Sequence, residues 1–291
     1  MELNGKWIKL VLQHWQYPKY RIVFLDSLCL LPGSLEKLAQ SFGVSHQKDD
    51  FDHGSVRLDN YRSLWKTTNL QHYLKCDCIG LLEILLRFAH AVARNHEIPL
   101  WRCLTAASLA KRIFLQCFYS ERFNLYYGSP EISHLLRQGY FGGRVEVFRR
   151  GLLQPAGGLS YYDMTSMYPT AMRFNALPTG RPRFTYKVCE AGTDRLHPDF
   201  FGFVMCTVKH RPDVVAAYDA HTERQWLPLH AHVHNKSLVV PLLKRGHDML
   251  LFSEEVRYAQ EKDLGYEYEF RWGIAFDKST GVFDSYIDTI F

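Results

Sequence analysis

The chain has 291 residues, of which 47% are hydrophobic and 22% charged, a composition typical of globular rather than disordered or fibrous proteins. Its formal net charge is +5, with 35 Lys and Arg against 30 Asp and Glu, which permits a polyanionic partner without requiring one. The longest apolar stretch, residues 79–89, contains Glu83 and Arg87 and is shorter than the roughly 20 residues of a membrane helix. No transmembrane helix is expected.

The N-terminus and the cysteines indicate an intracellular, reducing setting. Residues 1–7 lack the basic end and apolar run of a secretion signal. The seven cysteines are odd in number and scattered, with only Cys76 and Cys78 two positions apart, which favours neither a disulfide framework nor a metal knuckle. We expect reduced thiols, most of them buried.

The first half of the chain is predicted to be mainly helical. Its expected elements are, in chain order, a strand, a helix, a loop, a long core helix and two shorter helical stretches, at residues 20–26, 35–42, 47–68, 69–94, 104–118 and 132–136. The strand is β-branched and aromatic, Ser34 is placed to cap the first helix, and the long helix has leucines at helical spacing. The loop is polar and irregular.

The second half mixes strands and helices. Glycines at 139, 142 and 143 mark a break in composition, and we place a domain boundary after residue 138. The elements expected beyond it are a strand, a short helix, a strand, a helix and a strand, at residues 159–163, 166–174, 201–210, from 253 onward, and 266–276. The predicted fold class is therefore mixed α/β.

The most informative stretch is residues 161–170, Tyr-Tyr-Asp-Met-Thr-Ser-Met-Tyr-Pro-Thr. The expected strand presents the Asp163 carboxylate at its end, where it can hold a divalent metal ion. Backbone amides of the following turn can then bind a triphosphate. The Tyr168 ring can form a wall against the sugar. Taken singly, a solvated Asp at a strand end and a core Tyr explain these residues as well.

The full pattern Asp-x-x-Ser-x-Tyr-Pro resembles the first palm motif of family B DNA polymerases. The resemblance implies that Asp163 binds the catalytic Mg²⁺ or Mn²⁺ ions and that Tyr168 excludes ribonucleotides. It also implies contacts with the incoming deoxynucleoside triphosphate from Met164, Thr165, Ser166, Met167 and Tyr168.

A second motif, Tyr140-Phe-Gly-Gly-Arg144, combines two adjacent glycines, which allow close backbone approach, with a cation that can reach a phosphate. A plain turn is the alternative. The stretch resembles the Tyr-x-Gly-Gly element that joins the exonuclease and polymerase domains of the same family. The resemblance implies DNA contacts from Tyr140, Gly142, Gly143 and Arg144.

A third motif, Tyr73-Leu-Lys-Cys-Asp77, places a phenol and a carboxylate one helical turn apart on the same face. A surface pair is the alternative. The pattern resembles the third motif of 3′–5′ exonucleases, Tyr-x-x-x-Asp. The resemblance implies that Asp77 binds metal and that Tyr73 takes part in hydrolysis.

Two short stretches resemble elements of the protein-primed subfamily, although each could be plain loop. Residues 26–32, Asp-Ser-Leu-Cys-Leu-Leu-Pro, match an element that implies contacts of Ser27 and Leu28 with single-stranded DNA or the priming protein. Residues 48–51, Lys-Asp-Asp-Phe, match an element in which Lys48 would assist the exonuclease site.

Two other features are interpreted as ordinary structure. The alternate histidines His230, His232 and His234 could share a strand face and bind a metal, but a structural role is preferred. Asp50 and Asp52 imitate a polymerase Asp-x-Asp motif in the wrong domain, and a solvated loop is preferred.

The resemblance implies an internal part of a protein-primed DNA polymerase. Residues 1–138 would be the rear of a ribonuclease H-like 3′–5′ exonuclease domain, and residues 139–291 the front of a palm domain with a terminal-protein-type insertion at about 178–250. Implied partners are the DNA template and primer strand, deoxynucleoside triphosphates and a terminal priming protein, without a membrane. The source stays open among a virus, a linear plasmid, an organelle and a transposon, so the localisation stays open among a mitochondrial, a plasmid-borne and a viral one.

The family's first two exonuclease motifs and its downstream palm motifs are not found in the sequence, so the isolated chain is expected to be nearly inactive. An alternative is a non-catalytic relic that binds DNA or a priming protein. An unrelated nuclease is a more distant alternative because no other set of carboxylates clusters in the sequence.

Overall fold

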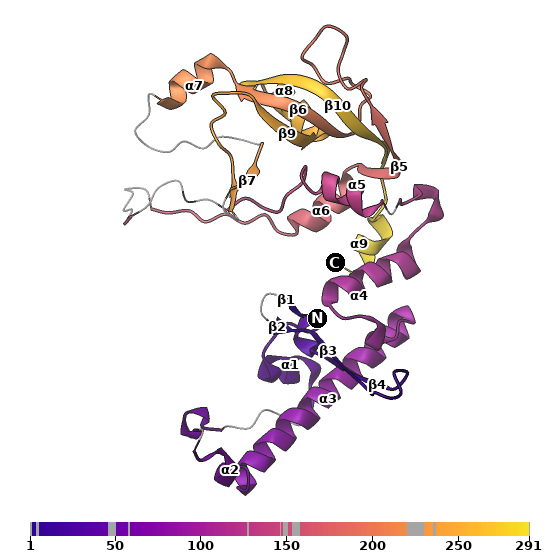
Figure 1. Ribbon diagram of the computed structural model, residues 1–291, viewed down its shortest axis with the longest axis vertical. Helices are drawn as coiled ribbons and strands as arrows, with labels where there is room; N and C mark the ends of the chain where they lie inside the picture. The colour runs from indigo at the N-terminus through magenta and orange to yellow at the C-terminus, as the bar shows by residue number, and fades with distance from the viewer. Residues whose placement is uncertain are drawn as a thin grey trace. The chain divides into compact units, whose positions relative to one another are not determined.

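The computed structural model describes residues 2–3, 6–45, 51–57, 59–126, 128–145, 147, 151–152, 158–219, 230–234 and 237–290. The chain divides into two compact units, Met1–Tyr119 and Ser120–Phe291 (Figure 1). Both helices and strands are present, as the mixed α/β prediction requires. The domain boundary predicted after residue 138 lies inside the second unit and stays a prediction.

The Met1–Tyr119 unit is built around one long helix. Its elements are β1 Glu2–Leu3, β2 Lys6–Trp7, β3 Lys9–Gln13, β4 Arg21–Leu25, α1 Leu35–Phe42, α2 Tyr61–Leu64, α3 Thr68–His96 and α4 Ala106–Ile113, which continues as a π-helical turn, Phe114–Phe118. The strand and helices predicted here are thus confirmed, while the stretch predicted as a loop contains α2 and a 3₁₀ turn, His53–Ser55.

Helix α1 lies along α3 (Figure 1). Ser34 caps α1 by accepting a hydrogen bond from the Lys37 amide, and Gly43 ends the helix in the left-handed conformation. Arg87 of α3 donates to the carbonyl of Phe42 over 2.7 Å. The expectation that α3 is a core helix holds for one face only, because leucines on its other face, such as Leu86, are exposed.

The Ser120–Phe291 unit is centred on a four-stranded antiparallel sheet in the order β5-β10-β6-β9. Its elements are α5 Pro130–Leu136, α6 Met167–Phe174, β5 Leu177–Thr185, β6 Gly202–His210, α7 Pro212–Asp219, β7 His232–His234, β8 Ser237–Val239, β9 His247–Phe252, α8 Ser253–Glu261, β10 Tyr266–Ser279 and α9 Asp284–Ile290. The segment predicted as an insertion therefore supplies three strands of this sheet, and its assignment as an insertion stays a prediction.

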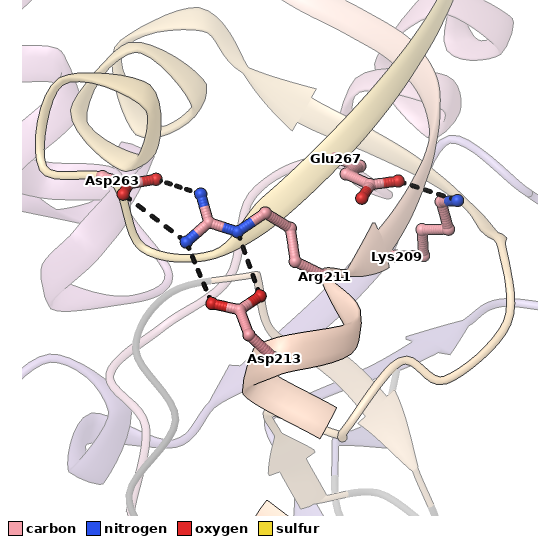
Figure 2. A network of polar contacts seen from close by, with 5 residues as sticks. All are labelled: Lys209, Arg211, Asp213, Asp263 and Glu267. Atoms are coloured by element: carbon pink, nitrogen blue, oxygen red, sulfur yellow. Dashed lines mark hydrogen bonds and ion pairs between the residues drawn. The ribbon is translucent and has the colours of Figure 1, made fainter. Parts of the chain in front are cut away.

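One face of the sheet forms the core of this unit. Alternate residues of β6, from Val204 to Val208, are fully buried with residues of β9, β10 and α8, and α8 packs on β6 and β9 (Figure 1). The intervening residues of β6 become polar toward its end. There Lys209 pairs with Glu267 of β10 over 2.7 Å, and Arg211 binds Asp213 and Asp263 (Figure 2).

Two predictions are wrong: the strand at residues 159–163 and the burial of most cysteines. Residues 159–163, predicted as a strand, have no regular structure, and Tyr161 and Tyr162 are about nine-tenths exposed, at 94% and 89%. A strand requires a paired neighbour, and this stretch pairs with no strand in the part of the chain that the structure describes. The cysteines are free but not mostly buried: only Cys103 and Cys206 are.

No helix among the residues covered by the structure is both long and apolar enough to traverse a lipid bilayer.

Candidate functional site

Helix α6 carries the residues predicted to bind nucleotide. Ser166 precedes the helix in the left-handed conformation, at φ 54°, and its carbonyl accepts the Thr170 amide over 2.9 Å. The chain therefore turns sharply into α6, as the sequence predicts for residues 166–174. Asp163 lies in the irregular segment before this turn and is exposed, and Tyr168 is 66% exposed.

The predicted turn residues are also solvent-accessible. Met164, Thr165, Ser166 and Met167 are all exposed, which leaves this turn accessible to a ligand. Ser166 makes no side-chain capping bond to α6.

The glycine motif and the α6 tyrosine meet in space, although they lie more than twenty residues apart in the sequence. A Cβ atom at Gly143 would lie 3.4 Å from the hydroxyl oxygen of Tyr168. Gly142 has open space around its Cα, and Tyr140 is 54% exposed. Arg144 is half-buried. The structure thus brings Gly143 and Tyr168 together, two residues that the sequence motifs single out separately.

Helix α6 is anchored to α9 by one arginine. Arg173 Nε donates to Asp288 Oδ1 over 2.7 Å, and its Nη1 lies 3.1 Å from Asp284 Oδ2. None of the α6 residues is fully buried, so these ion pairs contribute to holding the helix that follows Asp163. Sequence reasoning missed Arg173, and no local signal identifies it because its partners lie more than a hundred residues away.

Tyr168 lines a cavity of about 500 Å³ together with Phe201, Phe252, Glu254 and Lys278. Lys278 Nζ lies 3.5 Å from Glu254 Oε1 and sits over the Phe201 ring, 5.0 Å from its centroid. Beside Tyr168, the cavity therefore combines an aromatic wall with a Lys278–Glu254 ion pair. Lys278 and Glu254 were not predicted, because strand pairing and helix packing alone bring them to Tyr168.

The two residues of the predicted exonuclease motif contact each other on α3. A hydrogen bond to Asp77, aided by burial, raises the pKa of the Tyr73 hydroxyl. The Tyr73 ring stacks on Phe51 with centroids 5.3 Å apart. Asp77 Oδ1 is buried and has no hydrogen-bond partner among the described residues. An unpaired buried carboxylate oxygen is costly unless a donor or a cation binds it, so Asp77 fits a metal ligand.

The structure describes the first of the two subfamily elements but only part of the second. Ser27 and Leu28 lie in a 3₁₀ turn, Ser27–Cys29, capped by Asp26, whose Oδ1 accepts the Leu28 amide over 2.9 Å. Leu28 is 44% exposed, which leaves it open to a partner. Lys48 and Asp50 lie outside the described residues.

No metal centre is preassembled in the part of the chain that the structure covers, where no group of three His, Cys, Asp or Glu side chains gathers. Mg²⁺ commonly takes only one or two protein carboxylates and completes its shell with water and substrate phosphates, so exposed Asp163 fits one such ligand. His230 is fully buried and binds Glu255 and Tyr268 instead. Asp52 accepts the Gly54 amide in a turn, as expected for loop structure.

Comparison with known proteins identifies relatives along the whole chain. The family described as DNA polymerase type B, organellar and viral, matches residues 3–69 and 59–291. A probable DNA polymerase of Podospora anserina is 28% identical over 302 residues, which cover 93% of this chain and 23% of that protein. The DNA polymerase of Bacillus phage phi29 is 24% identical over 290 residues, covering 98% of this chain and 47% of the relative.

A solved structure has the same fold. The phi29 DNA polymerase complexed with primer-template DNA and incoming nucleotide substrates gives a TM-score of 0.66 at 19% identity, covering 98% of this chain and 47% of that one. The chain thus spans about a quarter to a half of the length of these relatives.

Proposed function

Because the chain belongs to the organellar and viral family of type B DNA polymerases, we propose that it forms part of a protein-primed polymerase that adds deoxynucleotides to a primer on a DNA template. The observation that carries this proposal is the meeting of Gly143 with the Tyr168 hydroxyl. It joins the element expected to bind DNA to the one expected to bind nucleotide. The corresponding replicon would be organellar or viral.

In this proposal Asp163 holds the divalent ion, Mg²⁺ or Mn²⁺, at the start of α6. When bound, such ions stabilise the charge that develops on the attacking and leaving oxygens of phosphoryl transfer. The backbone amides of residues 164–167 bind the triphosphate, and the Tyr168 ring fills the space that a ribose 2′-hydroxyl would need. Residues 140–144 position the template or primer strand through its backbone.

The Met1–Tyr119 unit would supply part of a 3′–5′ exonuclease. Asp77 would bind metal through its unpaired oxygen, and the Tyr73 hydroxyl, already hydrogen-bonded to Asp77, would orient the attacking water. Lys48 would assist this site, and Ser27 and Leu28 would contact a single DNA strand or the priming protein.

Two-metal transfer requires carboxylates beyond Asp163, and among the described residues Asp163 belongs to no group of three or more metal-ligating side chains. We therefore propose that the isolated chain has little polymerase activity and that transfer needs the complete enzyme. The same observation favours a second candidate function, a non-catalytic module that binds DNA or a priming protein.

The test is primer extension by the full-length polymerase that contains this chain. Asp163→Asn should lower extension by several orders of magnitude while primed DNA is still bound, because the metal-binding charge is lost and phosphate contacts remain. Asp199→Asn, an exposed carboxylate outside both motifs, is the matched control and should extend normally. Near-normal extension by Asp163→Asn would contradict the polymerase assignment, and inactivity of the wild-type enzyme with intact DNA binding would favour the non-catalytic module.

A further inference from the structure

A larger cavity in the Ser120–Phe291 unit lies beside the glycine motif. Its volume is about 920 Å³, within the range of ligand-binding pockets. Three phenylalanines of the sheet line it, Phe203, Phe252 and Phe276, and the rings of Phe252 and Phe276 lie 5.2 and 6.4 Å from that of Phe203. One wall is therefore a continuous aromatic surface.

The glycine motif supplies another wall of this cavity. Tyr140 and Phe141 line it and are 54% and 38% exposed. Gly139 fixes this segment to the sheet, because a Cβ there would lie only 2.8 Å from the Phe203 ring and 3.0 Å from the Leu250 carbonyl oxygen. The aromatic side chains of the motif therefore directly follow a residue that is packed against the sheet.

The carboxylate of Glu255 in this cavity is oriented by a buried histidine. Glu255 lines the cavity, and its Oε1 lies 2.7 Å from Nδ1 of His230, which is fully buried. His230 Nε2 in turn lies 2.5 Å from the Tyr268 hydroxyl. A carboxylate oxygen accepts, so Nδ1–H of His230 donates to Glu255 and orients its carboxylate. A carboxylate accepts several hydrogen bonds, so Glu255 retains capacity for a ligand.

A cation also lines the cavity. Arg144 contributes to its lining, and its charge opposes the rise that burial causes in the pKa of Tyr266, next to His230. The cavity therefore combines flat aromatic walls, a guanidinium and a fixed hydrogen-bond acceptor. Aromatic walls stack on bases, guanidinium groups bind phosphates, and carboxylates accept from exocyclic amino groups such as that of cytosine.

We propose that this cavity receives one unpaired nucleotide of a single DNA strand, with its base among the aromatic rings, its exocyclic amino group on Glu255 and its phosphate on Arg144. The inference deepens the proposed function, because it assigns a base-reading pocket to a segment expected only to contact the DNA backbone. Thymine offers a carbonyl oxygen where cytosine offers an amino group and would be disfavoured.

The test measures fluorescence anisotropy of labelled dC12 and dT12 single strands with the 291-residue chain at pH 8. We expect dC12 to bind at least about fivefold more tightly than dT12. Glu255→Gln should abolish this preference, because an amide can either accept from cytosine or donate to thymine, while it still accepts from His230 and preserves the fold. Glu267→Gln is the matched control, a carboxylate paired with Lys209 over 2.7 Å outside the cavity, and should keep the preference.

Two further variants test the other walls of the cavity. Phe141→Ala should weaken the binding of both strands about fivefold or more, because stacking on the ring is lost. Arg144→Met should reduce the slope of log K against log salt concentration by about one unit. An unchanged dC12-to-dT12 ratio in Glu255→Gln, or wild-type binding to neither strand, would overturn the inference. Because the readout is binding, these results are independent of the primer-extension test at Asp163.

Discussion

Acidification is expected to destabilise the Ser120–Phe291 unit through the buried imidazole of His210. This residue is 3% exposed, and its Nδ1 accepts the Leu243 amide over 2.9 Å. Its Nε2 has no hydrogen-bond partner in the part of the chain that the structure describes. Burial, reinforced by the charge of His230, lowers the pKa of His210 from 6.5 to about 4. His210 therefore binds a proton in the unfolded chain at pH values at which it stays neutral in the folded chain.

The direction and size of the effect follow from this pKa difference. Well above pH 6.5, His210 is neutral in both the folded and the unfolded state and adds no pH dependence. As the pH falls from 6.5 toward 4, only the unfolded state gains a proton, so the free energy of unfolding decreases. With pKa values of 6.5 and about 4, the decrease from pH 8 is about 2 kcal/mol at pH 5 and about 3 kcal/mol at pH 4.

The assay is urea unfolding of the chain between pH 4 and pH 8, compared with His210→Gln. Glutamine does not titrate and can still accept the Leu243 amide. The difference between the two unfolding free energies isolates His210, because the remaining groups titrate alike in both proteins. His197→Gln is the control, since His197 Nδ1 also accepts a backbone amide, that of Asp199 over 3.2 Å, but the residue is only partly buried. Parallel pH profiles for wild type and His210→Gln would refute the reasoning.

Substitutions at three other places test the remaining assignments. In the full-length polymerase, Tyr168→Val should raise relative ribonucleotide use about a hundredfold, since about 2.7 kcal/mol of steric conflict with the 2′-hydroxyl is removed. Unchanged kcat/KM ratios would contradict this role of Tyr168. Tyr73→Phe should slow degradation of single-stranded 3′ ends about a hundredfold and spare extension, whereas equal loss of both activities in Asp77→Ala would point to misfolding. Gly202→Ala should lower the unfolding free energy by more than about 2 kcal/mol, because the new Cβ meets a backbone carbonyl across the sheet. Gly142→Ala, which enters open space, should change it by less than about 0.5 kcal/mol, and melting curves of both variants decide.

The elements predicted correctly are those whose pattern is local. Leucine spacing suffices for α3 and capping by Ser34 for α1, because both effects act within a few residues. Strands depend on distant partners. Residues 159–163 have the composition of a strand but no neighbour, whereas β5 was missed because Pro178 and Pro182 argue against a strand. Its place at the edge of the sheet tolerates them.

The candidate site shows the same division. The motifs around Tyr73, Gly143 and Tyr168 could be found from short spacings, because the residues of each motif lie only a few positions apart in the sequence. The contact between Gly143 and Tyr168, and the entry of Lys278 and Glu255 into the cavities, arise only from packing of segments far apart in the chain. No spacing rule predicts such contacts.

The position of β10 in the sheet has a consequence for biosynthesis. β10 pairs with both β5 and β6, and β5 has no other strand partner among the described residues. During translation, about ninety residues must therefore follow β5 before it can pair with another strand, although Gly180 can already form an isolated bridge with Leu125. Closing so long a loop is entropically costly, and an unpaired strand edge is a site of aggregation. We expect nascent chains that stop before Tyr266 to need chaperone protection, and the sheet to close only once β10 has emerged from the ribosome.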